Sequence, residues 1–148
     1  MPEMELFVEF SGLTLEDSLH RILSELDAET GTLHDLGQDG LLHLRAHAGS
    51  IPEHLLTIIE RIPVGKGMAG LAAERGEPVQ ICNLQSDASG DARPGARATG
   101  MRGSICVPMR RHGQIVGVLG VAVAREREFS SAESTWLENA GATLALEL

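Results

Sequence analysis

The chain has 148 residues, of which 43% are hydrophobic and 22% charged, and this composition predicts one globular domain over residues 1–148. Its formal net charge is −9 and Lys66 is its only lysine, which argues against a nucleic-acid partner because phosphate binding requires clustered cations. No apolar run reaches the about 18 residues of a membrane span, and residues 1–5 are acidic where a signal peptide is basic, so we expect a cytoplasmic protein without a membrane partner.

The chain begins with a helical pattern and a predicted hairpin. Thr14 is a suitable N-cap, and the apolar residues that follow it recur at helical spacing: Leu15, Leu19, Ile22, Leu23 and Leu26. Residues 32–36 and 41–48 resemble strands joined by a turn at residues 37–40. Apolar and polar residues alternate along 41–48, so we expect one face of this strand to be exposed.

The middle of the chain predicts short elements. A helix is expected over residues 52–61, ended by Pro63, and a second over 68–75, ended by Gly76. Residues 78–82 follow as a strand. Residues 86–102 are rich in Gly, Ala, Ser, Asp and Arg, and we expect a loose loop of a length that is often functional.

The end of the chain predicts a hairpin and a closing helix. Residues 104–109 and 115–124 are strand-like, and Gly113 lies between them where a hairpin needs positive φ. Ser130 and Glu133 have the spacing of a capping box at the start of a helix over 130–148. The order of elements implies an α+β fold, with the terminal helices on one face of a sheet and the middle segment on the other.

Three segments in this order resemble a GAF domain: IPVGKGMAGLAAERGEPVQICN, RGSICVPMRRHGQIVGVLGV and EFSSAE. The resemblance covers residues 15–144. It implies a central antiparallel sheet of five to six strands, with the short helices and the long loop covering a ligand pocket on one face. It also implies a sensory domain that binds a small molecule, and a homodimer formed through the terminal helices.

Alternation along the last hairpin predicts where this pocket lies. Bulky residues share the face that suits the terminal helices, whereas Ser104, Cys106, Gly120 and Ala122 share the other face and leave volume beside the sheet. The alternative is that these small residues only let a covering helix approach closely. The predicted ligand-binding residues are Ile81, Asn83, Met101, Arg102, Ser104, Cys106, Gly120 and Ala122.

One enzymatic branch that the chain resembles is the free methionine sulfoxide reductase. In that branch the glycine-rich motif carries a cysteine, which here is replaced by Ala69, and the loop over 86–102 contains no cysteine. Thiol redox chemistry needs an accessible thiolate and a resolving partner. We expect Cys82 and Cys106 to be reduced and buried, so the enzyme is the alternative to a sensor, together with a dimerisation module that binds no ligand. Cyclic-nucleotide and bilin signatures are not matched.

Remaining charged and histidine residues offer weaker hypotheses. His43 and His47 share a face of a predicted strand, either as a metal pair or, more commonly, as solvated side chains. Arg93, Arg97 and Arg102 either bring positive charge to the pocket or belong to a solvated loop. We expect no catalytic residue, metal or cofactor. Exposed apolar residues on the terminal helices, Trp136 among them, are expected to form the dimer surface, and a separate effector is expected to receive the signal.

Overall fold

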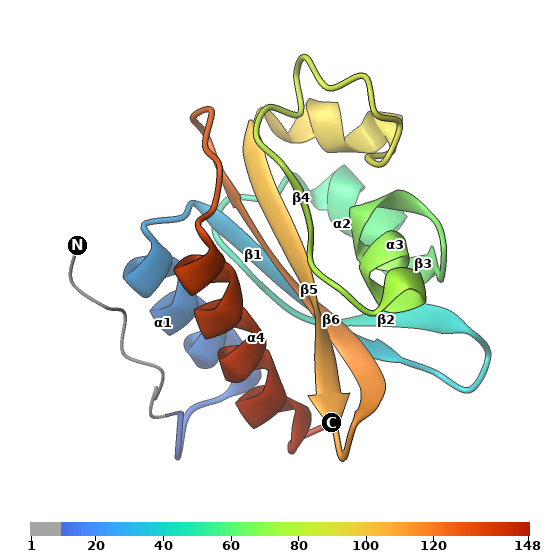
Figure 1. The fold of residues 1–148 in the computed structure, drawn as a ribbon, viewed down its shortest axis with the longest axis vertical. Coiled ribbons are helices and arrows are strands. Elements are labelled where there is room, and N and C mark those ends of the chain that lie inside the picture. The colour runs from blue at the N-terminus through green and yellow to red at the C-terminus, as the bar shows by residue number, and fades with distance from the viewer. Residues whose placement is uncertain (1–9) are drawn as a thin grey trace.

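A six-stranded antiparallel sheet forms the centre of the computed structural model, which describes residues 10–148 (Figure 1). The strand order is β3-β2-β1-β6-β5-β4. Residues 1–9, with the acidic segment noted above, lie outside the described residues. The prediction of an antiparallel sheet of five to six strands is confirmed. The strands are β1 (Thr30–Leu36), β2 (Leu41–Ala48), β3 (Arg61–Pro63), β4 (Val79–Ile81), β5 (Gly103–Arg111) and β6 (Gln114–Val123).

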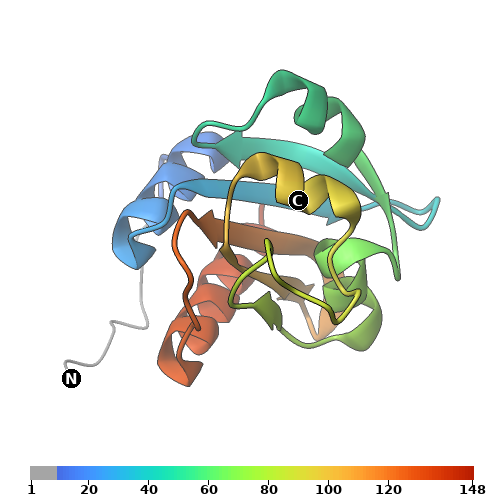
Figure 2. The same ribbon diagram turned by 90° about the horizontal axis from the view of Figure 1, so that it is seen from above.

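The helices divide between the two faces of the sheet, as predicted (Figures 1 and 2). The terminal helices α1 (Leu15–Leu26) and α4 (Ser131–Ala145) lie side by side on one face. The other face is covered by α2 (Glu53–Ile59), α3 (Gly67–Arg75) and the 3₁₀ helix η1 (Pro94–Thr99). Within residues 10–148, no helix combines the length and the apolarity that a membrane crossing requires.

Local signals fixed several ends of elements. Ser130 accepts a hydrogen bond from the Glu133 amide, and the Glu133 carboxylate accepts one from the Ser130 amide, so the capping box is present. The β5–β6 hairpin turns at His112 and Gly113, with φ values of 53° and 77°. Two consecutive residues with positive φ are the signature of a type I′ turn, which matches the twist of the strands.

Two elements differ from the expectation for the middle of the chain. The helix expected over 52–61 ends at Ile59, and Arg61–Pro63 instead pairs with β2 as an edge strand. Proline disfavours the helical conformation of the residue before it, which leaves Ile62 extended and buried. The loop expected over 86–102 is not wholly loose, because η1 begins at Pro94 and ends at Thr99, with Gly100, whose φ is 74°, as its C-cap.

A β-bulge changes the faces of β2. Leu33 pairs with Ala46 and His34 pairs with Leu44, so Arg45 has no partner in β1. One extra residue reverses the alternation of side chains. Ala46 therefore packs with the terminal helices, whereas Leu42 packs with residues of the opposite face. The expected single exposed face of β2, and the shared face of its histidines at 43 and 47, are both wrong for this reason.

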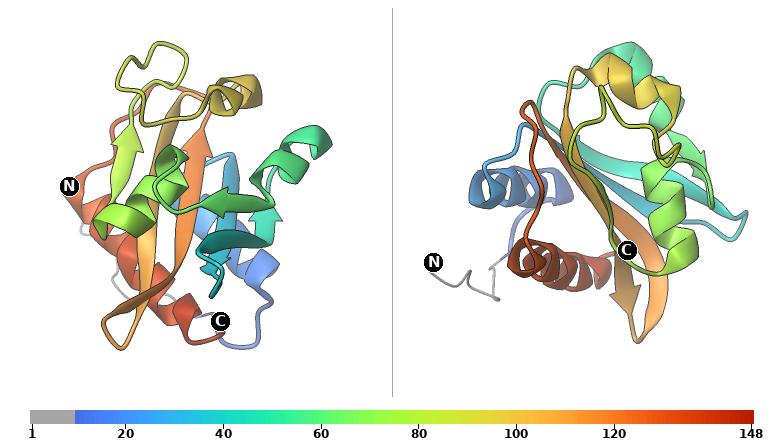
Figure 3. Two further views of the ribbon diagram at one scale, coloured as in Figure 1. Left: turned by 90° about the vertical axis from the view of Figure 1, so that its right-hand side faces the viewer. Right: turned by 45° about the horizontal axis from the view of Figure 1, so that its top comes forward.

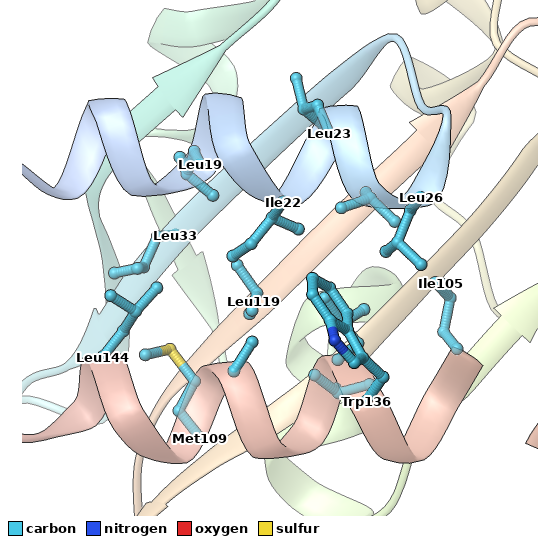
Figure 4. Packing of buried hydrophobic residues seen from close by; sticks show 14 of the residues in the cluster. Leu19, Ile22, Leu23, Leu26, Leu33, Ile105, Met109, Leu119, Trp136 and Leu144 are labelled. Carbon is cyan, nitrogen blue, oxygen red and sulfur yellow. The ribbon is translucent and has the colours of Figure 1, made fainter. Parts of the chain in front are cut away.

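The main core lies between the sheet and the terminal helices (Figure 4). Leu19 and Ile22 of α1 and Leu119 of β6 belong to this core, and Trp136 points from α4 toward α1. Trp136 is only 1% exposed. The expectation that it lies on an exposed dimer surface is wrong, because the apolar stripe of α4 faces the sheet and is used up inside one chain.

Candidate functional site

An open cavity of about 360 Å³ lies between the sheet and the elements that cover its second face. Figure 3 shows these covering elements, α2, α3 and η1, on one side of the sheet. We call it the sheet cavity. Its floor consists of two rows of small or polar residues that run across β1, β6 and β5 in register. The rows are Thr30–Ala122–Ser104 and Thr32–Gly120–Cys106.

Gly120 has no side chain and therefore leaves the space above the centre of this floor open. A Cβ atom at Gly120 would lie 3.0 Å from the Cys106 Sγ and 3.5 Å from the Thr32 Oγ1, so the neighbouring side chains already close around the position. Ser104 is held by a hydrogen bond from its hydroxyl to the Val121 carbonyl oxygen, at 3.2 Å. The register of the strands therefore determines which residues form the floor. The cavity above it is deep because these residues have small side chains.

The walls of the sheet cavity are mostly apolar. They come from elements that are far apart in the sequence. The apolar residues on them are Ile51 before α2, Leu55, Ile58 and Ile59 of α2, Ile62 of β3, Met68 and Ala69 of α3, Leu84 after β4, and Ala92, Ala96 and Met101 of the long loop. An apolar cavity with a few polar groups is the usual form of a site for a small molecule. The polar groups fix the orientation of such a ligand, and the walls supply most of the buried area.

Charge in the sheet cavity is of one sign. Lys66 and Arg93 line it, and no described aspartate or glutamate does, although the chain carries 21 acidic residues. The Arg93 stem lies against Gly67, where a Cβ would meet the Arg93 Cγ and Cδ at 3.1 Å. Of the three arginines expected at the rim, Arg97 and Arg102 do not line the cavity. The lining can therefore accept a negatively charged group at the Lys66 and Arg93 end.

His34 is a buried ionisable residue of the lining, with 2% exposure. Its Nε2 lies 2.8 Å from the Ile59 carbonyl oxygen, and this hydrogen bond joins β1 to the end of α2. Burial lowers the pKa of His34 below its ordinary value of 6.5, against smaller opposite effects of the Ile59 hydrogen bond and of Asp35. The ring is therefore neutral at pH 7.

Sequence reasoning missed the contribution of β1 to the cavity. Thr30, Thr32 and His34 alternate with Gly31 and Leu33, so they share one face of the strand. The sequence shows this alternation. The face of the sheet on which Thr30, Thr32 and His34 lie, however, depends on the pairing of β1 with β6. The residues of α2 were missed because nothing local places that helix over the sheet.

The structure brings together five of the eight predicted ligand-binding residues: Met101, Ser104, Cys106, Gly120 and Ala122 line the sheet cavity. Ile81 and Asn83 instead line a second, more polar pocket beside the long loop, and Arg102 is exposed and lines neither. Ile81 pairs with Ser104 at the edge of the sheet and packs in the core cluster of this face, whereas Asn83 lies beyond β4, which ends at Ile81. As ligand contacts, all eight residues remain predictions.

The two cysteines have different surroundings. Cys106 is buried in the floor, and burial raises the pKa of its thiol to about 12. Cys82 is exposed and lines the second pocket, so the expectation that both cysteines are buried is wrong for Cys82. Cys82 directly follows Ile81, the last residue of β4, and the elements that pack on the sheet do not cover its side chain. Within residues 10–148, no group of three His, Cys, Asp or Glu side chains is placed to hold a metal ion.

Side-chain hydrogen bonds attach the long loop to the body of the protein. The Gln85 amide donates to the Met101 carbonyl oxygen at 2.8 Å and to that of Arg97 at 3.1 Å. Arg75 at the end of α3 pairs with Asp91 at 3.4 Å. These bonds hold η1 over the cavity, so the loop acts as part of its wall.

Comparison with protein families and solved structures gives a consistent assignment of the fold. A family model described as GAF domain matches residues 14–148. No curated protein matches the chain by sequence. The solved structures described next are less than 25% identical to this chain, so their likeness concerns the fold alone.

Three solved structures illustrate this likeness. The free methionine-R-sulfoxide reductase from Neisseria meningitidis, in complex with its substrate, has 20% identity and a TM-score of 0.73 over 89% of this chain and 74% of that chain. The GAF domain from a phosphoenolpyruvate-protein phosphotransferase of Coxiella burnetii has 23% identity and a TM-score of 0.73 over 90% and 79%. The GAF domain region of a putative membrane protein from Geobacter sulfurreducens has 18% identity and a TM-score of 0.74 over 89% and 88%.

Proposed function

We propose that this chain, which belongs to the GAF domain family, is a non-enzymatic sensory domain that binds a small molecule in the sheet cavity. The observation that carries the proposal is the floor of small side chains, Ser104, Cys106, Gly120 and Ala122, under an open volume of about 360 Å³. If these residues served only to let a helix approach closely, the covering elements would fill that volume. The apolar walls favour a ligand with an apolar body.

The alternative is a thiol-based enzyme similar in activity to the free methionine-R-sulfoxide reductases that share the fold. The thiols of this chain support it poorly. Cys106 lies in the cavity, but its raised pKa leaves almost no thiolate at pH 7. Cys82 is exposed outside the cavity lining, so it is not placed to attack a ligand bound there.

A ligand screen tests the proposal. We expect native mass spectrometry or a thermal-shift panel of metabolites to find a compound that stabilises the protein, by about 2.7 kcal/mol at one hundred times its Kd. Ala122→Leu adds volume to the floor and should abolish this stabilisation. Ala122 suits the test better than Gly120, whose Cβ would already crowd Cys106.

The matched control is Ala142→Leu on the exposed side of α4. It makes the same chemical change far from the cavity and should leave ligand binding intact. Equal binding by both variants would show that the site lies elsewhere. An absence of any stabilising compound, with no bound mass in the native spectrum, would favour the module without a ligand.

Transmission of the signal is the remaining part of the proposal. We propose a homodimer through α1 and α4 that acts on a separate effector. Because Trp136 is buried, such a dimer would use the outer surfaces of these helices and Leu146, which is 68% exposed. Light scattering during size-exclusion chromatography would give the mass of two chains. A monomer at all concentrations would remove this part while leaving ligand binding untouched.

A further inference from the structure

The hydrogen bond between His34 and Ile59 fixes which ring nitrogen carries the proton. A backbone carbonyl oxygen only accepts hydrogen bonds, so the His34 Nε2, 2.8 Å away, must be the donor. In the neutral ring, the Nδ1 atom then holds a lone pair and only accepts. Burial disfavours the charged form and keeps this arrangement at neutral pH.

The His34 Nδ1 is buried and has no hydrogen-bond partner among residues 10–148. A buried acceptor without a donor lowers stability, and native proteins contain few of them. In the same part of the chain, the only other buried side-chain atom without a partner is the Ser18 hydroxyl of α1, on the opposite face of the sheet. His34 is thus the residue of the cavity lining that lacks a donor.

The surroundings of His34 allow a ligand to supply the hydrogen-bond donor that the Nδ1 atom lacks. His34 follows Thr30 and Thr32 along the floor, and Ile59 and Ile62 stand beside it in the lining. The ring is covered, and we expect a ligand to reach it between β1 and α2, which the His34–Ile59 hydrogen bond joins. The helix can yield there, because Leu55 is its only buried residue and no side chain caps its N-terminus.

We propose that the His34 Nδ1 is the specificity-determining acceptor of the sheet cavity, and that it binds an N–H or O–H group on an apolar ligand. This inference rests on the proposed function and names the class of ligand. A ligand with only an ether or carboxylate oxygen at this end gives Nδ1 no proton and binds more weakly. The same ring holds α2 through Ile59, so ligand and helix meet at one side chain.

Two probe pairs of equal shape test the inference: indole with benzofuran, and carbazole with dibenzofuran. The members of each pair differ in an N–H group that is replaced by oxygen. Isothermal titration calorimetry of the wild-type protein should show about three- to tenfold tighter binding of the N–H member, the worth of one net hydrogen bond.

Two variants separate the ring's two bonds. His34→Gln keeps a donor at the ε position for the Ile59 carbonyl but offers no acceptor at the δ position, so the preference for the N–H probe should disappear. His34→Asn places its oxygen at the δ position and cannot reach Ile59. It should keep the preference, while hydrogen exchange of the α2 amides becomes faster.

The outcomes distinguish this inference from the proposed function. Equal affinity for both members of a pair in the wild type, or a preference that survives in His34→Gln, would overturn the role of His34 and leave the cavity as a binding site. Failure of all four probes to bind would overturn the inference about His34, while the proposed function stands or falls with the metabolite panel. Nitrogen-15 NMR of the histidine rings should show the His34 Nδ1 unprotonated, with an upfield shift on addition of indole. A protonated Nδ1 would overturn the inference without any ligand.

Discussion

The two faces of the sheet are built from alternate residues of the same strands, and they differ in how they are filled. On one face, Ile105, Leu119 and Val121 pack against the terminal helices, with Trp136 between them. On the other face, Cys106 and Gly120 stand under an open cavity. The size of the side chains at alternate positions therefore decides which side of the sheet becomes a core and which becomes a site.

The helices on the two faces are also attached differently. On the filled face, α4 begins with a capping box and buries six residues along its length. On the open face, α2 has no side-chain cap, buries Leu55 alone and is joined to the sheet by the His34–Ile59 hydrogen bond. A binding face must admit a ligand, so weak attachment of its cover is consistent with the proposed function.

The largest effect is expected at the centre of the filled face. Trp136→Ala should lower the free energy of unfolding by about 3–5 kcal/mol, because it removes a large buried side chain that the surroundings cannot replace. Urea denaturation measures the change. The control is Thr135→Ala at the neighbouring exposed position, which should change the free energy of unfolding by no more than about 0.5 kcal/mol. A loss no larger than that of the control would show that this face is not tightly filled.

Adjacent residues of β6 allow the two faces to be compared directly. Val121→Leu adds one carbon to the filled face and should cost about 1–3 kcal/mol through overpacking. Ala122→Leu adds three carbons on the cavity side and should change stability by about 0.5 kcal/mol or less, because open volume receives them. Chemical denaturation of both variants gives the comparison. Similar losses in the two would mean that the cavity is closed in solution.

A smaller effect is expected at the cap of α4. Ser130→Ala removes the acceptor for the Glu133 amide and should cost about 1 kcal/mol. The neighbouring variant Ser131→Ala, at an exposed position without a cap, should be almost neutral. Thermal unfolding monitored by circular dichroism measures both. Equal stability of the two variants would remove the contrast between the capped α4 and the uncapped α2.

The smallest effect is expected from the charge state of His34. Its pKa is lowered in the folded protein, so near pH 6.5 and below the unfolded chain binds a proton that the folded protein does not. The free energy of unfolding should therefore fall as the pH falls from 6.5 toward the folded pKa. His34→Gln should remove this part of the pH dependence. A difference between wild type and variant that stays constant from pH 8 to pH 5 would contradict a lowered pKa.

Much of the fold could be predicted from neighbouring residues. Helical spacing after Thr14, the capping box at Ser130 and the glycine of the last hairpin are signals within a few residues, and the structure confirms each of them. Alternation in β5 and β6 also assigned bulky and small residues to opposite faces. These predictions succeeded because backbone preference and side-chain period act over short stretches of chain.

The rest depended on contacts between distant segments. Thr32, Gly120 and Cys106 form one row only because β1, β6 and β5 pair in a particular register, and no local pattern encodes that register. The bulge opposite His34, the burial of Trp136 and the placement of α2 over the floor have the same origin. The sequence by itself determined which residues are small, apolar or turn-forming. The tertiary structure decided which of them meet, because pairing and packing free energies are summed over the whole sheet rather than along the chain.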